Sequence, residues 1–461
     1  MDIEDIRMLI FDKRKISFNN MVDLSAFKVL YIDPGTGGML FAVLFGVFSV
    51  LVFSVRSLLM KIKFSSGVKD AKLNENKIPI AIYAESKRYW NIFRPLLDEF
   101  EKRQQKIVYL TGSKDDPVFD QNYKYIKGEY LGEGNKVFSR LNLLNASVVL
   151  TTTPSLDVFQ WKRSNNVDCY IYISHNPNDI TMYRMFGIDH YDALILSGEY
   201  LERQARQLEE LRHYKPKDIA LCGLPFMDEM KKRLDASGEV PPHEKTVLLA
   251  PTWGENGLLT KYGERFIDAL IATGYKIILR PHPQSFTTEK EMMDRLKAKY
   301  TDNDKFSWNR DNDNFEVLRQ SDILISDFSG VIFDYALVFD KPIIYTDTKI
   351  DLSPFDAFWL KEEPWTLRIL PDLGLKLSEE DFDKMKEIID KCIDDPSFAS
   401  GRDKARAETW VHIGEGAARS VDFVIKKYNE QVEIKKAKEK EAAQAKTKPA
   451  KTKGLKLKGA G

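Results

Sequence analysis

Residues 322–345 read DILISDFSGVIFDYALVFDKPIIY, and this stretch decides the fold. The pattern predicts a short apolar strand over 323–325, a polar turn over 326–330, a helix over 331–339 and a second strand over 343–345. Strand, turn, helix and strand in this order form one unit of an α/β sheet. A turn of small residues at a helix N-terminus presents free backbone N–H groups, which favours a bound phosphate. The same pattern also fits an ordinary capped turn.

The turn and the helix behind it supply candidate ligands for that phosphate. Ser326 and Ser329 are residue types that cap helices well, and Gly330 leaves its N–H group accessible. Asp334 follows Gly330 by one helical turn on the same face, within reach of a ribose or glycerol hydroxyl. The alternative for Asp334 is an ordinary charge on the helix surface.

A second stretch, KIILRPHPQS over 276–285, ends a predicted strand in Arg280 and His282. Ligands of open α/β sheets bind at the carboxyl ends of the strands. Two prolines stiffen this end. The guanidinium group of arginine matches phosphate oxygens, and histidine can donate a proton near neutral pH. We therefore predict that Arg280 and His282 bind phosphate.

Two further strands end in candidate site residues. The stretch VLLAPTWGEN over 247–256 places Thr252 and Trp253 where they can line a nucleotide pocket. The stretch YIYISHNPND over 170–179 ends a strand in His175, well upstream of the other candidates. This separation predicts a donor site in one domain and an acceptor site in another.

The composition is that of a globular enzyme of two or three domains, with 461 residues and equal numbers of basic and acidic side chains, 69 each. Residues 433–461 contain ten lysines and three glutamates, so this tail has an excess of positive charge and the rest of the chain an excess of negative charge. That distribution argues against a nucleic-acid enzyme. The tail either solubilises the chain or is attracted to anionic lipids. The three cysteines and six histidines are too scattered for a disulfide framework or a zinc site, and the sequence requires no metal or cofactor.

One segment is apolar enough to cross a membrane. Residues 38–55 are uncharged, and 18 residues span about 27 Å as a helix, near the minimum for a bilayer. Arg56, Lys61 and Lys63 follow the segment, so the positive-inside rule places the C-terminal bulk of the chain in the cytoplasm. The alternative is a buried core helix.

Alternating apolar strands and amphipathic helices predict an α/β fold with two tandem doubly wound, Rossmann-like domains behind an N-terminal transmembrane helix. The two sets of strand ends then face a common cleft. The expected segments are a leader over 1–33, a transmembrane helix over 34–60, a linker over 61–77, an N-terminal acceptor domain over 78–226, a connector over 227–245, a C-terminal nucleotide-binding domain over 246–395, closing helices over 396–430 and a disordered tail over 431–461.

Taken together, these motifs resemble the CDP-glycerol glycerophosphotransferase family. The residues that carry the resemblance, which covers roughly 78–425, are Pro251-Thr252-Trp253, Arg280-x-His282-Pro283, Ser326-Asp327-x-Ser329-x-Val331-x-Phe333-Asp334 and Lys341-Pro342-Ile343-Ile344. The family comprises teichoic-acid primases and polymerases with the GT-B fold. The resemblance implies a cytosolic CDP-glycerol donor, release of CMP, a lipid-linked or polymeric acceptor, and two important histidines, here His175 and His282.

The chain departs from the family pattern at two places. The family's His-Gly-Thr reads His175-Asn176-Pro177 here, and its Ser-Ser pair reads Ser329-Gly330. Gly330 still offers a free N–H group to phosphate. With the membrane segment, the resemblance implies an enzyme anchored by a single span in a bacterial cell membrane, with its catalytic domains in the cytoplasm and His175 as the general base.

Two alternatives remain open at this point. A glycosyltransferase of the same fold, acting on a nucleotide-sugar for capsule or other surface polysaccharide, would use the same elements. A membrane-tethered module that binds nucleotide without turnover would also fit, because the residues after His175 are altered. The UDP-sugar 2-epimerases share this architecture, but a membrane anchor argues against an enzyme of small soluble substrates.

Overall fold

The computed structural model describes residues 77–311 and 313–447, which belong to one compact unit of the chain. The predicted leader over 1–33, the transmembrane helix over 34–60 and nearly all of the linker over 61–77 lie outside the described residues. Among the helices that are described, none is both long and apolar enough to cross a bilayer.

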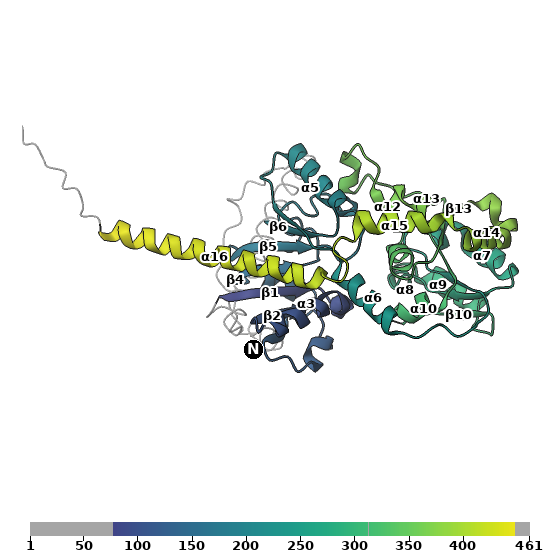
Figure 1. The fold of residues 1–461 in the computed structure, drawn as a ribbon, viewed down its shortest axis with the longest axis horizontal. Coiled ribbons are helices and arrows are strands. Elements are labelled where there is room, and N and C mark those ends of the chain that lie inside the picture. Colours follow the sequence, from purple (N-terminus) through teal and green to yellow (C-terminus); the bar gives the residue numbers. More distant parts are fainter. Residues whose placement is uncertain (1–76, 312, 448–461) are drawn as a thin grey trace, which may run out of the picture. The chain divides into compact units, whose positions relative to one another are not determined.

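The first sheet has seven parallel strands in the order β3-β2-β1-β4-β5-β6-β7 (Figure 1). The chain moves outward from β1 to β3, returns to β4 beside β1, and then moves outward on the other side. The strand order therefore reverses between β1 and β4, the place where such sheets bind ligands. The strands are β1 (Ile78–Ala84), β2 (Ile107–Thr111), β3 (Ile126–Tyr130), β4 (Ala146–Thr151), β5 (Val167–Ile173), β6 (Ala193–Leu196) and β7 (Asp218–Leu221).

The second sheet repeats this topology with six parallel strands in the order β10-β9-β8-β11-β12-β13. Its order reverses between β8 and β11, so the turns after these two strands are neighbours. The strands are β8 (Thr246–Leu249), β9 (Lys276–Leu279), β10 (Phe306–Trp308), β11 (Ile323–Ser326), β12 (Ile343–Thr346) and β13 (Gly374–Leu377). Two tandem doubly wound domains, as predicted, are confirmed.

Helices connect the strands, and their apolar sides pack on the sheets. The α-helices are α3 (Trp90–Lys102), α4 (Asn135–Leu141), α5 (Glu199–Arg212), α6 (Pro225–Ala236), α7 (Leu258–Ala272), α8 (Ser285–Thr288), α9 (Lys290–Lys299), α10 (Phe315–Gln320), α11 (Val331–Phe333), α12 (Trp365–Arg368), α13 (Leu370–Leu373), α14 (Met385–Asp394), α15 (Ser397–Thr409) and α16 (Gly416–Thr447). Short 3₁₀ turns are η4 (Lys87–Tyr89), η5 (Pro117–Asp120), η6 (Ile180–Met182), η8 (Asp356–Trp359) and η9 (Glu379–Lys384), and η7 (Asp334–Val338) is a π-helix.

The edge strands β3, β10 and β13 were not predicted. β3 reads IKGEY and β13 reads GLKL, so neither has the continuous apolar run of the central strands. Edge strands are covered on fewer sides, and charged side chains there prevent pairing with other chains. A search for apolar runs therefore misses them.

The first half of the connector predicted over 227–245 is helical. α6 begins at Pro225, whose fixed φ suits the first turn of a helix, and it ends at Ala236. Met227 and Met230 are buried, and this spacing of three places them on one face. The many charges of the segment explain why it was predicted as a polar connector and not as an amphipathic helix.

The prediction for the C-terminal region was also partly wrong. The closing helices were expected to end at residue 430, but α16 continues to Thr447. Its first half packs back on the N-terminal domain against α3, β4 and β5 (Figure 1). Beyond that contact the helix consists of good helix formers, with pairs such as Glu433 and Lys436 one turn apart at 2.8 Å. Local propensity explains why helix continues into the predicted tail.

The two domains are joined by a buried carboxylate. Asp179, after β5, accepts hydrogen bonds from the Trp365 N–H at 2.8 Å and from the Thr366 N–H and hydroxyl at 2.8 and 2.6 Å. Beside it, the Trp365 ring packs between Tyr200 of the first domain and Phe333 of the second, with centroids 5.0 and 5.3 Å away. These contacts hold the loop after β5 against the helix that follows β11.

We expect Asp179→Asn to lower the free energy of unfolding by about 2 kcal/mol, because one of the two oxygens that accept these N–H groups becomes a donor. Chemical denaturation measures the change. Asp157→Asn, a partly exposed position in the same domain, is the control and should change stability by less than about 0.5 kcal/mol. Equal stabilities of the two variants would contradict this assignment.

Candidate active site

His175 lies just beyond the carboxyl end of β5, one residue after the buried Ser174. The neighbouring strand β4 ends at Thr151, so Thr152 stands beside His175, and its Oγ1 lies 2.6 Å from His175 Nδ1. Tyr89 packs its ring edge-to-face against the imidazole at 6.0 Å. Burial lowers the pKa of His175 to about 4, so the ring is neutral at physiological pH. A neutral imidazole is the form that a general base requires.

The loop after His175 meets the turn that follows β11. Asn176 Nδ2 lies 3.3 Å from His175 Nε2. A side chain at Gly330 would place its Cβ 3.2 Å from Asn178 Nδ2 and 3.7 Å from Asn176 Nδ2. The structure therefore brings the loop that follows His175 in the first domain against Gly330 of the second, although 152 positions separate Asn178 from Gly330 in the sequence. Only a residue without a side chain fits there without a shift.

The residues of the turn after β11 that were predicted to bind the donor differ in their burial and contacts. Ser329 and Gly330 are half-buried, and their carbonyls accept the first hydrogen bonds of the following helix at 3.1 Å. Ser326 is different: it is fully buried and its hydroxyl donates to the Ala250 carbonyl at 2.7 Å. The predicted donor-binding role of Ser326 is not supported, because its hydroxyl ties β11 to the end of β8.

Asp327, between these serines, organises the loop after β8. Its carboxylate accepts hydrogen bonds from the backbone N–H groups of Thr252, Leu258 and Phe328 at 2.8 to 3.1 Å. These bonds fix Thr252 next to the turn after β11, because β8, which precedes Thr252, pairs with β11. Trp253 follows with 45% of its surface exposed, and its ring lies 6.2 Å from His282. The predicted pair is thus available to a ligand beside His282.

Arg280 and His282 follow β9 as predicted. The Gln284 N–H donates to His282 Nδ1 at 3.1 Å, which leaves Nε2 as the ring nitrogen for a ligand. Arg280 hydrogen bonds through its guanidinium to the Asn309 side chain. Burial, and secondly the charge of Arg88, lowers the pKa of His282, and burial lowers the pKa of Arg280.

The 3₁₀ turn η4, which follows β1, carries one residue near each of the two histidines. Tyr89 contacts the ring of His175, and the adjacent Arg88 is close enough to His282 to lower its pKa. Arg88 is exposed, so its guanidinium is available to a ligand that lies between the domains. Neither residue was predicted from the sequence, because their strand carries no motif; the signal was their position after β1, where the strand order reverses.

Asp334 lies within the π-helix η7, one turn beyond Gly330. A π-turn interrupts α-helical bonding and is frequent at functional sites. Burial raises the pKa of Asp334 to about 7, and a hydrogen bond with Asn314 acts in the opposite direction. The carboxyl group is therefore half-buried and close to its titration point, which is unlike the exposed surface charge of the alternative interpretation.

We expect Asp334→Asn to gain stability relative to the parent chain as the pH rises from 5 to 8. The folded chain holds the Asp334 proton up to about pH 7, whereas an unfolded aspartate releases it near pH 4. The stability contributed by this group is complete below pH 4 and is lost as the pH rises through 7; asparagine is neutral throughout. Melting temperatures at both pH values test this, with the exposed Asp304→Asn as control. A difference that is the same at pH 5 and 8 would contradict it.

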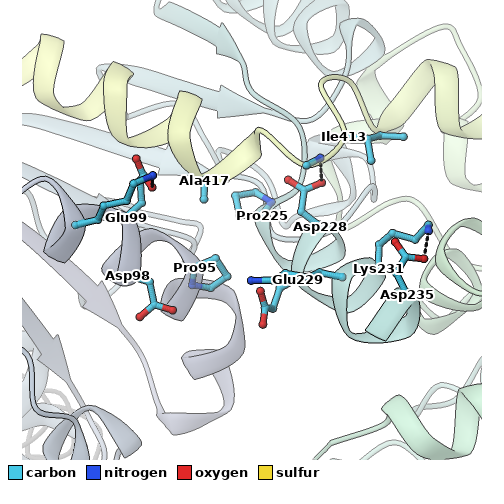
Figure 2. A pocket seen from close by; sticks show the side chains of 13 residues that line it. Pro95, Asp98, Glu99, Pro225, Asp228, Glu229, Lys231, Asp235, Ile413 and Ala417 are labelled. Atoms are coloured by element: carbon cyan, nitrogen blue, oxygen red, sulfur yellow. Dashed lines mark hydrogen bonds and ion pairs between the residues drawn. The ribbon is translucent and has the colours of Figure 1, made fainter. Parts of the chain in front are cut away.

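A cavity of about 600 Å³ lies away from these residues, between α3, α6 and the turn before α16 (Figure 2). Its lining alternates acidic and basic side chains, among them Asp98, Glu229 and Lys231. Asp228 is tied to the turn through the N–H groups of Gly414 and Gly416 at 2.7 and 2.9 Å. None of the predicted site residues lines this cavity.

Comparison with known proteins gives a family match that spans the candidate residues. Residues 174–352 match the model of the CDP-glycerol:poly(glycerophosphate) glycerophosphotransferase family, a range that contains all nine predicted site residues. The chain is 31% identical over 160 residues to the minor teichoic acid biosynthesis protein GgaB of Bacillus subtilis, which is 29% of this chain and 16% of that protein. It is 22% identical over 285 residues to the teichoic acid glycerol-phosphate primase of Bacillus spizizenii, covering 55% of this chain and 70% of the primase. The chain thus spans only a small part of GgaB but most of the primase.

Solved structures agree with the fold. The wall teichoic acid polymerase TagF superimposes with a TM-score of 0.51 at 18% identity, over 83% of this chain and 98% of the TagF chain. A putative UDP-N-acetylglucosamine 2-epimerase from Listeria monocytogenes gives 0.50 at 12% identity, over 75% of this chain and 95% of the epimerase. At these identities the likeness establishes the GT-B-like architecture of two parallel sheets. Residues 174–352 of this chain are therefore similar to the CDP-glycerol:poly(glycerophosphate) glycerophosphotransferase family.

Proposed function

We propose that this protein transfers glycerol phosphate from CDP-glycerol to a hydroxyl group of a lipid-linked or polymeric acceptor in the synthesis of a teichoic-acid-like surface polymer, with release of CMP. The observation that carries the proposal is the contact between the His175 loop and the Gly330 turn, both inside the matched region. This contact supports a site in which a histidine of one domain acts on a ligand bound at the half-buried turn of the other.

In the proposed reaction, His175 Nε2 takes the proton of the acceptor hydroxyl. That oxygen forms a bond to the β-phosphorus of CDP-glycerol, and the bond from this phosphorus to the bridging oxygen breaks. CMP leaves with the electron pair of that bond, and the proton remains on His175. The low basicity of the ring is compensated by positioning, because a base held next to its hydroxyl needs no encounter step.

The donor phosphates are proposed to bind the second domain. His282 Nε2, the Arg280 guanidinium and the Ser329 and Gly330 N–H groups are the candidate donors, and Arg88 adds a positive charge from the first domain. Phosphoryl transfer is accelerated mainly by positioning and by stabilising charge on the equatorial and departing oxygens, which is what such a set of donors supplies. Thr252 and Trp253 are proposed to line the nucleotide pocket, and Asp334 to face a ribose or glycerol hydroxyl.

A donor screen tests the proposal. The full chain, purified in detergent, is supplied with an acceptor-containing membrane extract and with CDP-glycerol, CDP-ribitol, UDP-glucose or UDP-N-acetylglucosamine. We expect CMP release from CDP-glycerol to be faster than CMP release from CDP-ribitol and faster than nucleotide release from the two UDP-sugars. Turnover of a UDP-sugar alone would indicate the glycosyltransferase, and binding of CDP-glycerol without any turnover would indicate the non-catalytic module.

We also propose that the protein is held at the bacterial cell membrane by a single span, with its catalytic domains in the cytoplasm. The support is the uncharged run over 38–55 and the basic residues that follow it. Removal of residues 1–64 should yield a protein that no longer sediments with membranes but still binds CDP-glycerol. An unfolded truncated protein would instead assign the segment to the core.

A further inference from the structure

The hydrogen bonds around His175 determine which of its ring nitrogens carries the proton. The first of these hydrogen bonds comes from a backbone N–H group, which fixes the direction of the bond. The Asn178 N–H donates to Asn176 Oδ1 at 3.2 Å, and a backbone N–H can only donate. The oxygen of the Asn176 amide therefore points to Asn178, and its NH₂ group points to His175.

The next bond follows from the first. Asn176 Nδ2 lies 3.3 Å from His175 Nε2, and an amide NH₂ group is a donor only. His175 Nε2 must then accept, so it carries a lone pair and no proton. In a neutral imidazole the proton is on the other nitrogen.

Nδ1 therefore carries the proton and donates it to Thr152 Oγ1 at 2.6 Å. Thr152 is 1% exposed, which shields this bond from water. The Thr152 hydroxyl, which accepts from Nδ1, can also donate one hydrogen bond. A hydrogen bond from Thr152 to the phenol of Tyr172 lowers the pKa of that buried tyrosine, against the larger effect of burial. Tyr172 in turn bonds to the Tyr183 hydroxyl. The hydrogen-bonded contacts run without a break from Asn178 to the tyrosines.

We propose that Thr152 is the positioning residue of the transfer reaction: it holds His175 in the tautomer whose Nε2 lone pair faces the acceptor, and the Asn176 amide occupies the place that the acceptor hydroxyl takes when it binds. The inference rests on the proposed function for the identity of the reaction, but the tautomer does not depend on it. Asn176 is the residue at which the chain departs from the family's His-Gly-Thr pattern, so the proposal also gives that departure a role.

The direct test is the protonation of the ring in the full chain. Nitrogen NMR of protein labelled with ¹⁵N-histidine distinguishes a protonated from an unprotonated ring nitrogen, and the His175 signals among the six histidines are those that disappear in His175→Ala. We expect the parent protein to show Nε2 unprotonated and Nδ1 protonated. A proton on Nε2 would overturn the proposal.

Three variants give the functional test. Thr152→Val has the same shape but no acceptor for Nδ1–H; we expect the tautomer to shift and turnover to fall by about 10–100-fold, with an unchanged KM for CDP-glycerol. Thr152→Ser restores the oxygen and should recover turnover to within about threefold of the parent. Asn176→Asp keeps the oxygen that accepts from Asn178 but presents an acceptor to Nε2, which must then carry a proton; turnover should fall by roughly 10³-fold.

The outcomes separate this inference from the proposed function. If the parent chain releases no CMP with any donor, the proposed function fails while the NMR result still decides the tautomer. If the parent is active and Thr152→Val keeps its turnover, or loses it without a change of tautomer, the positioning role is wrong. Should Thr152→Val fail to fold, Thr152→Ser and Asn176→Asp still decide the question, because both retain the polar contacts that hold the loop.

Discussion

Replacing His175 by alanine is expected to lower turnover by about 10²–10⁴-fold, the usual loss for a general base, while the affinity for CDP-glycerol changes little. The reason is geometric. His175 lies in the first domain at the end of β5, whereas the proposed donor ligands follow β8, β9 and β11 of the second. Steady-state rates of CMP release and calorimetric titration with CDP-glycerol measure the two effects separately.

His243→Ala is the matched control for this variant. His243 is an exposed histidine in the loop before β8, and its loss should leave turnover within about twofold of the parent. An unaltered rate in His175→Ala would show that the reaction uses another base, such as a group of the substrate itself.

His282→Ala is expected to lower turnover by about 10²-fold or more and also to weaken binding of CDP-glycerol. His282 is proposed to bond the donor phosphates in the ground state as well as in the transition state, so both quantities change. His175→Ala and His282→Ala should therefore differ in the titration and agree in the loss of rate.

His282→Asn separates a contact with the ligand from a role in the loop. The asparagine oxygen can accept the Gln284 N–H in place of Nδ1, but the side chain lacks the Nε2 edge that faces a ligand. We expect this variant to be as impaired as alanine. Recovery of both activity and affinity in His282→Asn would show that the histidine only shapes the turn.

Much of the fold could be predicted from the sequence, because central strands of parallel sheets are covered on both faces and read as continuous apolar runs. β8, β9, β11 and β12 were recognisable in this way. Elements whose polarity is mixed were not: β3 and β13 are edges, and α6 is amphipathic among many charges. Their structure depends on what covers them.

Some residues of the candidate site could likewise be predicted from the sequence and others could not. His175, His282 and the Ser329-Gly330 turn could be predicted because each follows an apolar strand, and strand ends of parallel sheets are ligand sites. Their partners could not. Thr152 precedes His175 by 23 residues, and only the pairing of β4 with β5 brings them together. Arg88 and Tyr89 reach the site because β1 lies at the reversal of strand order.

By itself, the sequence determined the two-domain α/β architecture, the strand ends that are proposed to carry the chemistry, and the likeness to the glycerophosphotransferases, since these depend on local patterns of polarity. The tertiary structure alone decided that the Ser326 hydroxyl donates to the Ala250 carbonyl, and that the Asn176–Asn178 loop of one domain meets Gly330 of the other. Side-chain direction and contacts between domains follow from strand register and order, which arise from packing over the whole chain and have no signature in any short stretch of residues.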